Sequence, residues 1–239
     1  MRTISKKIGI VSLAMMSLLL PALAEESHGH GGERFHKLNL EVGGGQTDKS
    51  AAVTAWDFHG WLGSDKNKLW LKAEGERENG QTEKSELWAM YSRNVTTFWD
   101  AQVGLKHDTQ PSALSYFVMG VEGLAPYFLE TEAHVFISED ADVSLRLHQE
   151  TGFLLTQKLM LQPSIGMQLY AQDVPELEIA AGLSDAEIGL QLRYEFTRKF
   201  APYIEVKYER KLGETLSIAK SNGEGADTVA GLLGVRLMF

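Results

Sequence analysis

The chain has 239 residues, enough for one large folded unit, and its 23 basic and 32 acidic residues give a formal net charge of −9. Nucleic-acid phosphates need clustered Lys and Arg, so this acidic balance argues against nucleic-acid binding. The sequence contains no cysteine, which excludes disulfide bonds and thiolate chemistry.

The first 24 residues have the three parts of a secretory signal peptide. Arg2, Lys6 and Lys7 form a basic start, residues 8–20 form an apolar core, and residues 22–24 form a small-x-small cleavage site. The core is too short for a helix that crosses a bilayer, which needs roughly 20 apolar residues. Residues 1–24 are therefore predicted to be a cleaved signal peptide. Its removal leaves the exported chain with 20 basic and 32 acidic residues, a balance that attracts cations.

Residues 25–35 are predicted to form a short flexible leader, because they contain too few apolar side chains to pack. The leader holds His28 and His30, with His36 shortly after it. Mobile histidines capture divalent metal ions weakly, so His28 and His30 are candidate metal ligands. The alternative interpretation is a solvated linker, since a spacing of one residue has low specificity.

From residue 36 to residue 239 the chain alternates apolar and polar residues, which is the period of a β-strand. In one example, Trp99, Ala101, Val103 and Leu105 are separated by polar or small residues. Most of the segments are roughly 9 to 12 residues long, the length of a tilted strand that crosses a membrane. The twelve predicted strands begin near His36, Ala51, Lys68, Lys84, Phe98, Ser115, Tyr127, Asp142, Lys158, Asp185, Ala201 and Asp227.

Such alternation fits either a soluble all-β protein with its apolar face inward or a membrane barrel with that face toward lipid. Three features favour the membrane barrel. The even-numbered links are tight and the odd-numbered links mostly longer, above all 171–184 and 212–226. The chain ends in a strand whose last residue is Phe239. Aromatic residues near the predicted strand ends are Trp61, Trp70, Trp88, Trp99, Tyr127, Tyr170, Phe200 and Tyr203. We therefore predict an all-β protein, a transmembrane antiparallel barrel of about twelve strands in the outer membrane of a Gram-negative bacterium.

The predicted lumen face carries many charged residues of both signs. A small barrel usually fills its interior with paired polar side chains, so the pattern indicates a salt-bridged interior or a narrow wet channel. These residues are Lys72, Glu74, Glu76, Lys84, Glu86, Glu130, Glu132, Arg146, Glu150, Glu187, Arg193, Glu195, Glu205, Lys207, Glu209 and Arg236.

Residues that bind soft or borderline metals are predicted on the same face. Thioether sulfur selects Cu(I), imidazole binds either oxidation state of copper, and carboxylates suit Cu(II). A single methionine is more often packing than ligand, and hydrogen bonding to Glu or Arg is an equal alternative for the histidines. The leading candidates are His134, His148, Met90 and Met160. Met238 on the same face and His107 are further candidates, and His107 and His59 are predicted close to strand ends.

Motifs for catalysis are missing from the sequence. It contains no nucleophile elbow, no HExxH, no phosphate-binding loop and no dinucleotide fingerprint. The register also places no Ser and His on neighbouring strands in the way a barrel hydrolase requires. We therefore predict that the protein is not an enzyme.

Several stretches of the chain resemble the copper resistance protein B family, outer-membrane proteins of bacterial copper-resistance systems. The resemblance runs through nearly all of the predicted barrel. The matching stretches are 100–108 (DAQVGLKHD), 123–127 (GLAPY), 136–140 (FISED), 155–163 (LTQKLMLQP), 182–184 (GLS), 192–195 (LRYE), 200–203 (FAPY) and 234–239 (GVRLMF).

The resemblance implies copper binding and a role in copper tolerance at the outer membrane. It also implies copper ions, membrane lipid and periplasmic copper-handling proteins as partners. Family members commonly carry a long leader rich in Met and His, whereas residues 25–33 here hold two histidines and no methionine. Copper binding is then expected to depend more on the lumen residues. A non-selective narrow porin and a structural anchor for other copper-system proteins are the alternative functions.

Overall fold

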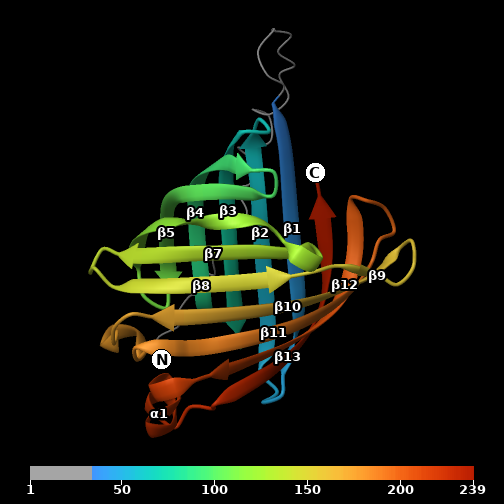
Figure 1. Cartoon of the computed structure of the whole chain (residues 1–239). Helices are drawn as coiled ribbons and strands as arrows, with labels where there is room; N and C mark the ends of the chain where they lie inside the picture. Colours follow the sequence, from blue (N-terminus) through green and yellow to red (C-terminus); the bar gives the residue numbers. More distant parts are fainter. Residues whose placement is uncertain (1–33) are drawn as a thin grey trace, which may run out of the picture. The chain divides into compact units, whose positions relative to one another are not determined.

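The computed structural model describes residues 34–239, which form one closed antiparallel β-barrel (Figure 1). β1 pairs with β13 from Asn39 opposite Met238 to Thr47 opposite Ala230, and this pairing closes the barrel. In the described part, no helix is both long enough and apolar enough to cross a membrane. The elements are β1 (Phe35–Thr47), β2 (Ala52–Gly63), β3 (Asn67–Glu78), β4 (Gln81–Thr96), β5 (Trp99–Gln110), β6 (Leu114–Ala125), β7 (Leu129–Ser138), β8 (Val143–Glu150), β9 (Phe153–Leu154), β10 (Leu159–Tyr170), β11 (Gly182–Tyr194), β12 (Phe200–Lys211), α1 (Gly213–Ser221) and β13 (Asp227–Met238).

The strand prediction is confirmed. Within residues 34–239 the structure has twelve long strands and the two-residue β9, and each long strand begins within three residues of its predicted start. Alternation locates these strands well because each one separates two environments along its whole length. The predicted signal peptide 1–24, and His28 and His30 of the predicted leader 25–35, lie outside the described residues and stay predictions.

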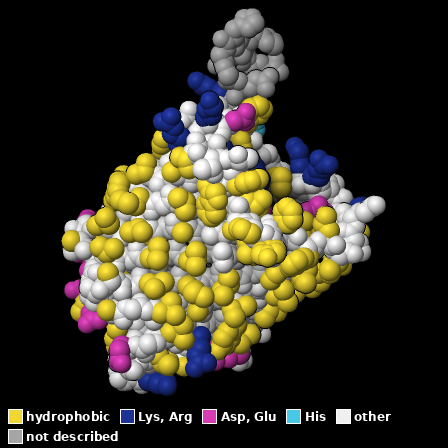
Figure 2. Space-filling model, in the orientation of Figure 1, with side chains coloured by type: hydrophobic (Ala, Val, Ile, Leu, Met, Phe, Trp, Pro, Cys, Tyr) yellow, Lys and Arg dark blue, Asp and Glu magenta, His cyan; other side chains and the backbone are white. Residues whose placement is uncertain are grey.

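The outer face of the barrel is apolar. Leu69, Leu87 and Leu105 are exposed there, and Figure 2 shows hydrophobic side chains spread over the face in view, with Lys, Arg, Asp and Glu gathered toward its edges. A continuous exposed apolar surface of this kind is what a barrel presents to lipid. The membrane interpretation of the alternation is therefore the one that the structure supports.

The predicted alternation of link lengths is only partly correct. The long odd-numbered links are 171–181 and 212–226, and the second of these contains α1. The other odd-numbered links, such as 48–51 and 79–80, are short, and the even-numbered link 151–158, which was predicted to be tight, is longer than they are and contains β9. Several strands continue further than expected, as β4 does to Thr96, and they take up residues that the sequence pattern assigned to loops.

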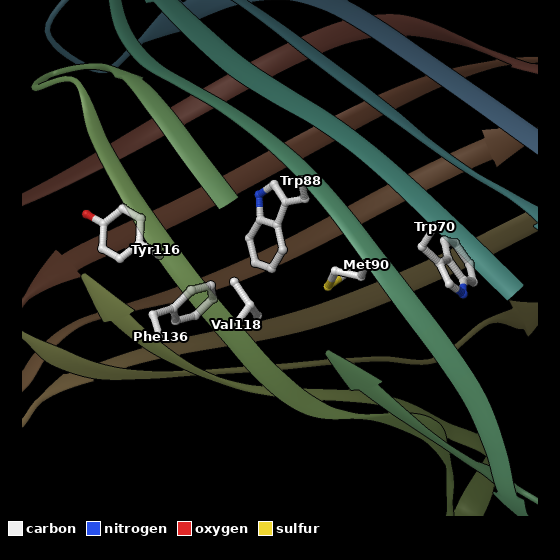
Figure 3. Close-up of a cluster of buried hydrophobic side chains, with 6 residues drawn as sticks. All are labelled: Trp70, Trp88, Met90, Tyr116, Val118 and Phe136. Carbon is white, nitrogen blue, oxygen red and sulfur yellow. The ribbon is translucent and has the colours of Figure 1, made fainter. Parts of the chain in front are cut away.

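The interior is packed on one side, in the arc from β3 to β7. Six side chains form a buried cluster there, and Figure 3 shows them directed toward one another from neighbouring strands. Two of the aromatics expected near lipid head groups, Trp70 and Trp88, belong to this cluster, and Tyr203 is also buried. The predicted interfacial position of these three is wrong, because each lies on the polar face of its strand. The cluster consists of Trp70, Trp88, Met90, Tyr116, Val118 and Phe136.

Candidate metal site in the lumen

Trp88 lies at the centre of the packed arc and is surrounded by cations. Lys106 Nζ lies 5.6 Å from the centroid of the Trp88 ring, Arg146 Cζ lies 5.5 Å from it and Lys72 Nζ 5.9 Å. A cation within about 6 Å of an aromatic face is attracted by the ring quadrupole. The aromatic cluster therefore holds three positive side chains inside the barrel.

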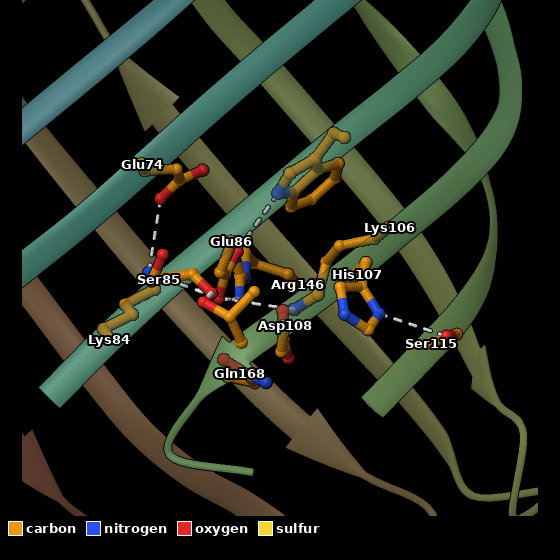
Figure 4. Close-up of polar contacts among 12 residues, drawn as sticks. Glu74, Lys84, Ser85, Glu86, Lys106, His107, Asp108, Ser115, Arg146 and Gln168 are labelled. Carbon is orange, nitrogen blue, oxygen red and sulfur yellow. Dashed lines mark hydrogen bonds and ion pairs between the residues drawn. The ribbon is translucent and has the colours of Figure 1, made fainter. Parts of the chain in front are cut away.

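Glu86 balances much of this positive charge. Both terminal nitrogens of Arg146 donate to its carboxylate, at 3.0 and 2.9 Å, and Trp88 Nε1 donates to it at 3.1 Å. Lys106 Nζ lies 3.3 Å from the same carboxylate, and Figure 4 shows this group of side chains. Arg146 is on β8 and Glu86 on β4, with three strands between them in the sheet. The pair therefore joins parts of the wall that are not neighbours.

A second ion pair crosses the same arc. Lys72 Nζ on β3 donates to Glu132 Oε2 on β7 at 2.5 Å. Together with Arg146 and Glu86, this pair fills the lumen between β3 and β8 with side chains. The prediction of a salt-bridged interior is correct for this arc.

His134 on β7 is held in one orientation by a relay of hydrogen bonds. Gln102 Nε2 donates to Glu122 Oε2 at 2.6 Å, which turns Gln102 Oε1 toward His134. His134 Nε2 lies 2.7 Å from that oxygen and therefore donates to it. The lone pair of the neutral ring is then on Nδ1, which lies 4.0 Å from Glu132 Oε2, too far for a hydrogen bond. Metal-binding histidines commonly have their second ring nitrogen fixed in this way.

The structure brings His148 and His134 to the same carboxylate. His148 is on β8, directly opposite Glu132 in the register, and His134 follows Glu132 by two residues on β7. His148 Nε2 lies 3.6 Å from Glu150 Oε2. His134 is only 2% exposed, whereas the His148 side chain is 38% exposed. The pair thus has a buried member and a member that lumen water can reach.

This group of side chains is not a closed coordination cage. Among residues 34–239, no three His, Asp or Glu side chains are placed to hold a metal ion together. Lys72 already occupies one oxygen of Glu132, so a cation bound at this carboxylate competes with Lys72. Side-chain rotation at His148 and Glu150, which are partly exposed, is the movement that this arrangement allows most readily.

The three candidate methionines contact residues other than His134 and His148. Met90 is fully buried in the aromatic cluster. Arg193 Nη2 donates to Met160 Sδ at 2.9 Å, so this sulfur already has a positively charged partner. Met238 lines a small cavity together with Arg193 near the end of the barrel where β13 ends.

His107, a reserve candidate near a predicted strand end, lies on the outer face of the barrel and not in the lumen. It continues the outward series of Val103 and Leu105, while its neighbours Lys106 and Asp108 are buried inside. Its Nδ1 lies 3.1 Å from Ser115 Oγ on the neighbouring strand β6, and Figure 4 shows this contact. The predicted register contained no such Ser–His pair on neighbouring strands, so that expectation is wrong at this position. Residues at every second position of a strand lie on the same face, so His107 shares the outer face with Val103 and Leu105.

Several polar residues of the lumen were missing from the predicted set. They are Gln102, Lys106, Asp108 and Glu122, which lie on the inner face of β5 and β6. The alternation in β5 could have identified the first three as lumen residues, because Gln102, Lys106 and Asp108 lie at the positions between the outward residues such as Val103. Their partners on β7 and β8 are far away in sequence, and nothing in the sequence pairs Gln102 with His134.

Solved structures with a similar fold include two porins. The barrel is similar to the NanC porin with a TM-score of 0.60 and 15% identity, over 83% of this chain and 98% of that one. It is also similar to the KdgM porin with a TM-score of 0.55 and 10% identity, over 84% of this chain and 99% of that one. Identities this low show the fold alone. The chain is a porin-like barrel of the outer membrane.

Two curated relatives are more similar in sequence. Copper resistance protein B of Escherichia coli is 41% identical over 77% of this chain and 63% of its own length. The copper resistance protein B homolog of Pseudomonas syringae pv. tomato is 36% identical over 81% of this chain and 66% of its own length. The chain thus spans somewhat less than two thirds of the length of these relatives. Residues 35–239 match the family model described as copper resistance protein B precursor (CopB), and the chain belongs to the copper resistance protein B family.

Proposed function

We propose that this barrel binds copper ions in its lumen and contributes to copper resistance by sequestering them or letting them pass. Family membership supports the choice of metal. The structural observation that supports the site is that His148 lies opposite Glu132 on the next strand and His134 lies two residues from it on the same strand, with a lone pair on His134 Nδ1. In this role copper is the ion that the barrel binds or transports, and the protein catalyses no reaction.

The chemistry of the site fits copper in both oxidation states. Imidazole binds Cu(I) and Cu(II), and the carboxylates of Glu132 and Glu150 favour Cu(II). Met160 would have to release Arg193 before its sulfur could bind a cation, because the guanidinium repels a positive ion. We therefore place the two histidines first and treat Met90, Met160 and Met238 as further candidates for Cu(I). Periplasmic copper-handling proteins are the proposed protein partners.

Metal titration of the purified, detergent-folded protein tests the proposal. The His134→Gln/His148→Gln double variant is expected to lose saturable binding of copper, because both imidazoles that face Glu132 are removed. The His107→Gln variant is the matched control, since it removes an imidazole from the outer face and is expected to bind copper like the parent. Cu(I), Cu(II) and Zn(II) are compared, and the same titration is repeated without residues 25–33.

Each result of this titration has a definite meaning. Copper binding that survives in the double variant would contradict the lumen site. If that binding is lost only when residues 25–33 are removed, the metal ligands belong to the leader that holds His28 and His30. A joint Leu variant of the three methionines shows separately whether Cu(I) depends on sulfur.

The hydrogen-bond relay to His134 gives a second prediction. Gln102→Leu is expected to weaken copper binding by about 10- to 100-fold, the usual effect of removing a partner that orients a metal ligand. Gln149→Leu is the control, because Gln149 adjoins His148 and bonds Thr131 on the opposite face of the sheet. Isothermal titration compares the two variants. Equal affinities would show that the orientation of His134 does not matter for copper.

A narrow porin without preference for copper is the second candidate function, favoured by the similarity of the fold to NanC and KdgM. Conductance in a planar bilayer separates the two candidates. A porin passes Na⁺, K⁺ and Cu²⁺ in matched salts with similar conductance. The copper site instead predicts that micromolar copper reduces the current of other cations, and that the His134→Gln/His148→Gln variant removes this block.

A further inference from the structure

A small cavity lies inside the barrel near the end where β1 begins and β13 ends, which is the periplasmic end because the long links are at the other end. The space open to the centre of a water-sized particle is about 10 Å³, which leaves room for one small ion or water molecule. Three arginines line it, Arg193, Arg198 and Arg236, and Glu195 is the one carboxylate among its lining residues. The walls of the cavity therefore carry an excess of positive charge.

Arg193 has only neutral hydrogen-bond acceptors. It is 5% exposed, and its Nη1 donates to Gln162 Oε1 at 3.0 Å and to Gln191 Oε1 at 3.2 Å. Its Nη2 donates to Met160 Sδ. Its Nε is buried and without a hydrogen-bond partner, and Glu195 Oε1 is 3.9 Å from that atom. A buried guanidinium without a bonded carboxylate is costly, and an anion removes that cost.

Arg236 on β13 also has a guanidinium nitrogen without a hydrogen-bond partner. Its Nε is also buried without a hydrogen-bond partner, although Glu41 Oε1 lies 3.3 Å away as an ion-pair partner. Glu41 is shared, because its other oxygen accepts a hydrogen bond from Gln191 Nε2 at 3.1 Å. Two arginines whose Nε–H is buried and has no hydrogen-bond partner thus line the same cavity, and only part of their charge is balanced.

We propose that this cavity binds a monovalent anion of the size of chloride. The anion would be held by the guanidinium groups of Arg193 and Arg236, and Arg198 would add a third positive charge from the link 195–199. This inference concerns a site separate from the histidine pair and does not depend on copper binding.

The opposite end of the lumen has the opposite charge. A cavity of about 130 Å³ there is lined by several acidic residues, among them Glu76, Glu187 and Glu209, and by two lysines. Cations are therefore attracted to the extracellular mouth and anions to the periplasmic one. An anion at the arginines would also lower the repulsion that a cation meets near Met160 and Met238.

Chloride binding can be measured by ³⁵Cl NMR, since exchange with a protein site broadens the line of the free ion. The full-length protein in detergent is expected to broaden the chloride line in a saturable way, and bromide is expected to displace the effect. Arg193→Gln is expected to weaken binding about tenfold, because loss of one charge-assisted donor is comparable to the 1.4 kcal/mol of a tenfold change. Arg198→Gln, in an exposed link, provides a second variant that leaves the interior packing intact.

Arg77→Gln is the matched control. It removes one arginine at the extracellular end, where Arg77 donates to Gly80 O, and is expected to leave chloride binding unchanged. Circular dichroism verifies that each variant is folded. The proposal is overturned if the parent protein gives no saturable broadening, as a water-filled cavity would. It is also overturned if folded Arg193→Gln and Arg198→Gln bind like the parent, or if Arg77→Gln loses as much binding as they do.

Discussion

Glu86→Ala is expected to lower the free energy of unfolding of the barrel by about 3–5 kcal/mol, the usual cost of removing one partner from a buried ion pair. The variant leaves Arg146 and Lys106 inside the barrel without the carboxylate that both contact, and Trp88 Nε1 without its acceptor. Reversible urea unfolding in detergent or lipid measures the effect.

Glu224→Ala is the matched control for this prediction. Glu224 forms an ion pair with Lys211 in the exposed link 212–226, where such a pair contributes about 0–1 kcal/mol. The double variant Glu86→Ala/Arg146→Ala is expected to lose less stability than the two single variants together, because it leaves no unpaired guanidinium at that position. If Glu86→Ala lowers the free energy of unfolding as little as Glu224→Ala does, water reaches the ion pair between Glu86 and Arg146.

Leu105→Arg is expected to cost about 2–4 kcal/mol when the barrel folds into a lipid bilayer, as for a cation placed on the lipid face near the bilayer midplane. Leu105 is 64% exposed in the middle of β5, and its neighbours across the strands are Ala89 and Phe117. In a water-soluble barrel this substitution would place a charge in solvent at almost no cost. Urea unfolding of the protein in lipid vesicles measures the difference in unfolding free energy between the variant and the parent.

Thr109→Arg is the control for the lipid-facing prediction. Thr109 is on the same face of β5 but one residue from its end, where the same charge is expected to cost about 0–1 kcal/mol. The outward assignment of β5 would be contradicted if both variants cost the same, or if Leu105→Arg cost nothing.

The strands could be predicted from the sequence because each one has a lipid face and a lumen face along its length. The series Val103 and Leu105 therefore locates β5 and also puts His107 outside, although the metal chemistry of histidine suggested the lumen. Link lengths were less predictable. Nothing in the sequence marks where a strand leaves the membrane, and β4 continues to Thr96 beyond its apolar part.

The site could be predicted only in part. The positions of His134 and His148 on adjacent strands follow from a register that a short link fixes. The contacts that give His134 its orientation could not be predicted, since Gln102 is two strands away in the sheet and Glu122 belongs to a third. Likewise, Arg146 and Glu86 are each recognisable as lumen residues, but their pairing depends on the cross-section of the closed barrel.

The ion pairs between β3 and β7 and between β4 and β8 also have a mechanical consequence. They brace one arc of the wall, whereas the arc from β11 to β1 is spanned by the hydrogen bond between Gln191 and Glu41. A tube that is braced over part of its circumference deforms where the braces are weaker. We therefore expect fluctuations in the width of this barrel to be largest on the side of β11, β12 and β13, the strands next to the two longest links.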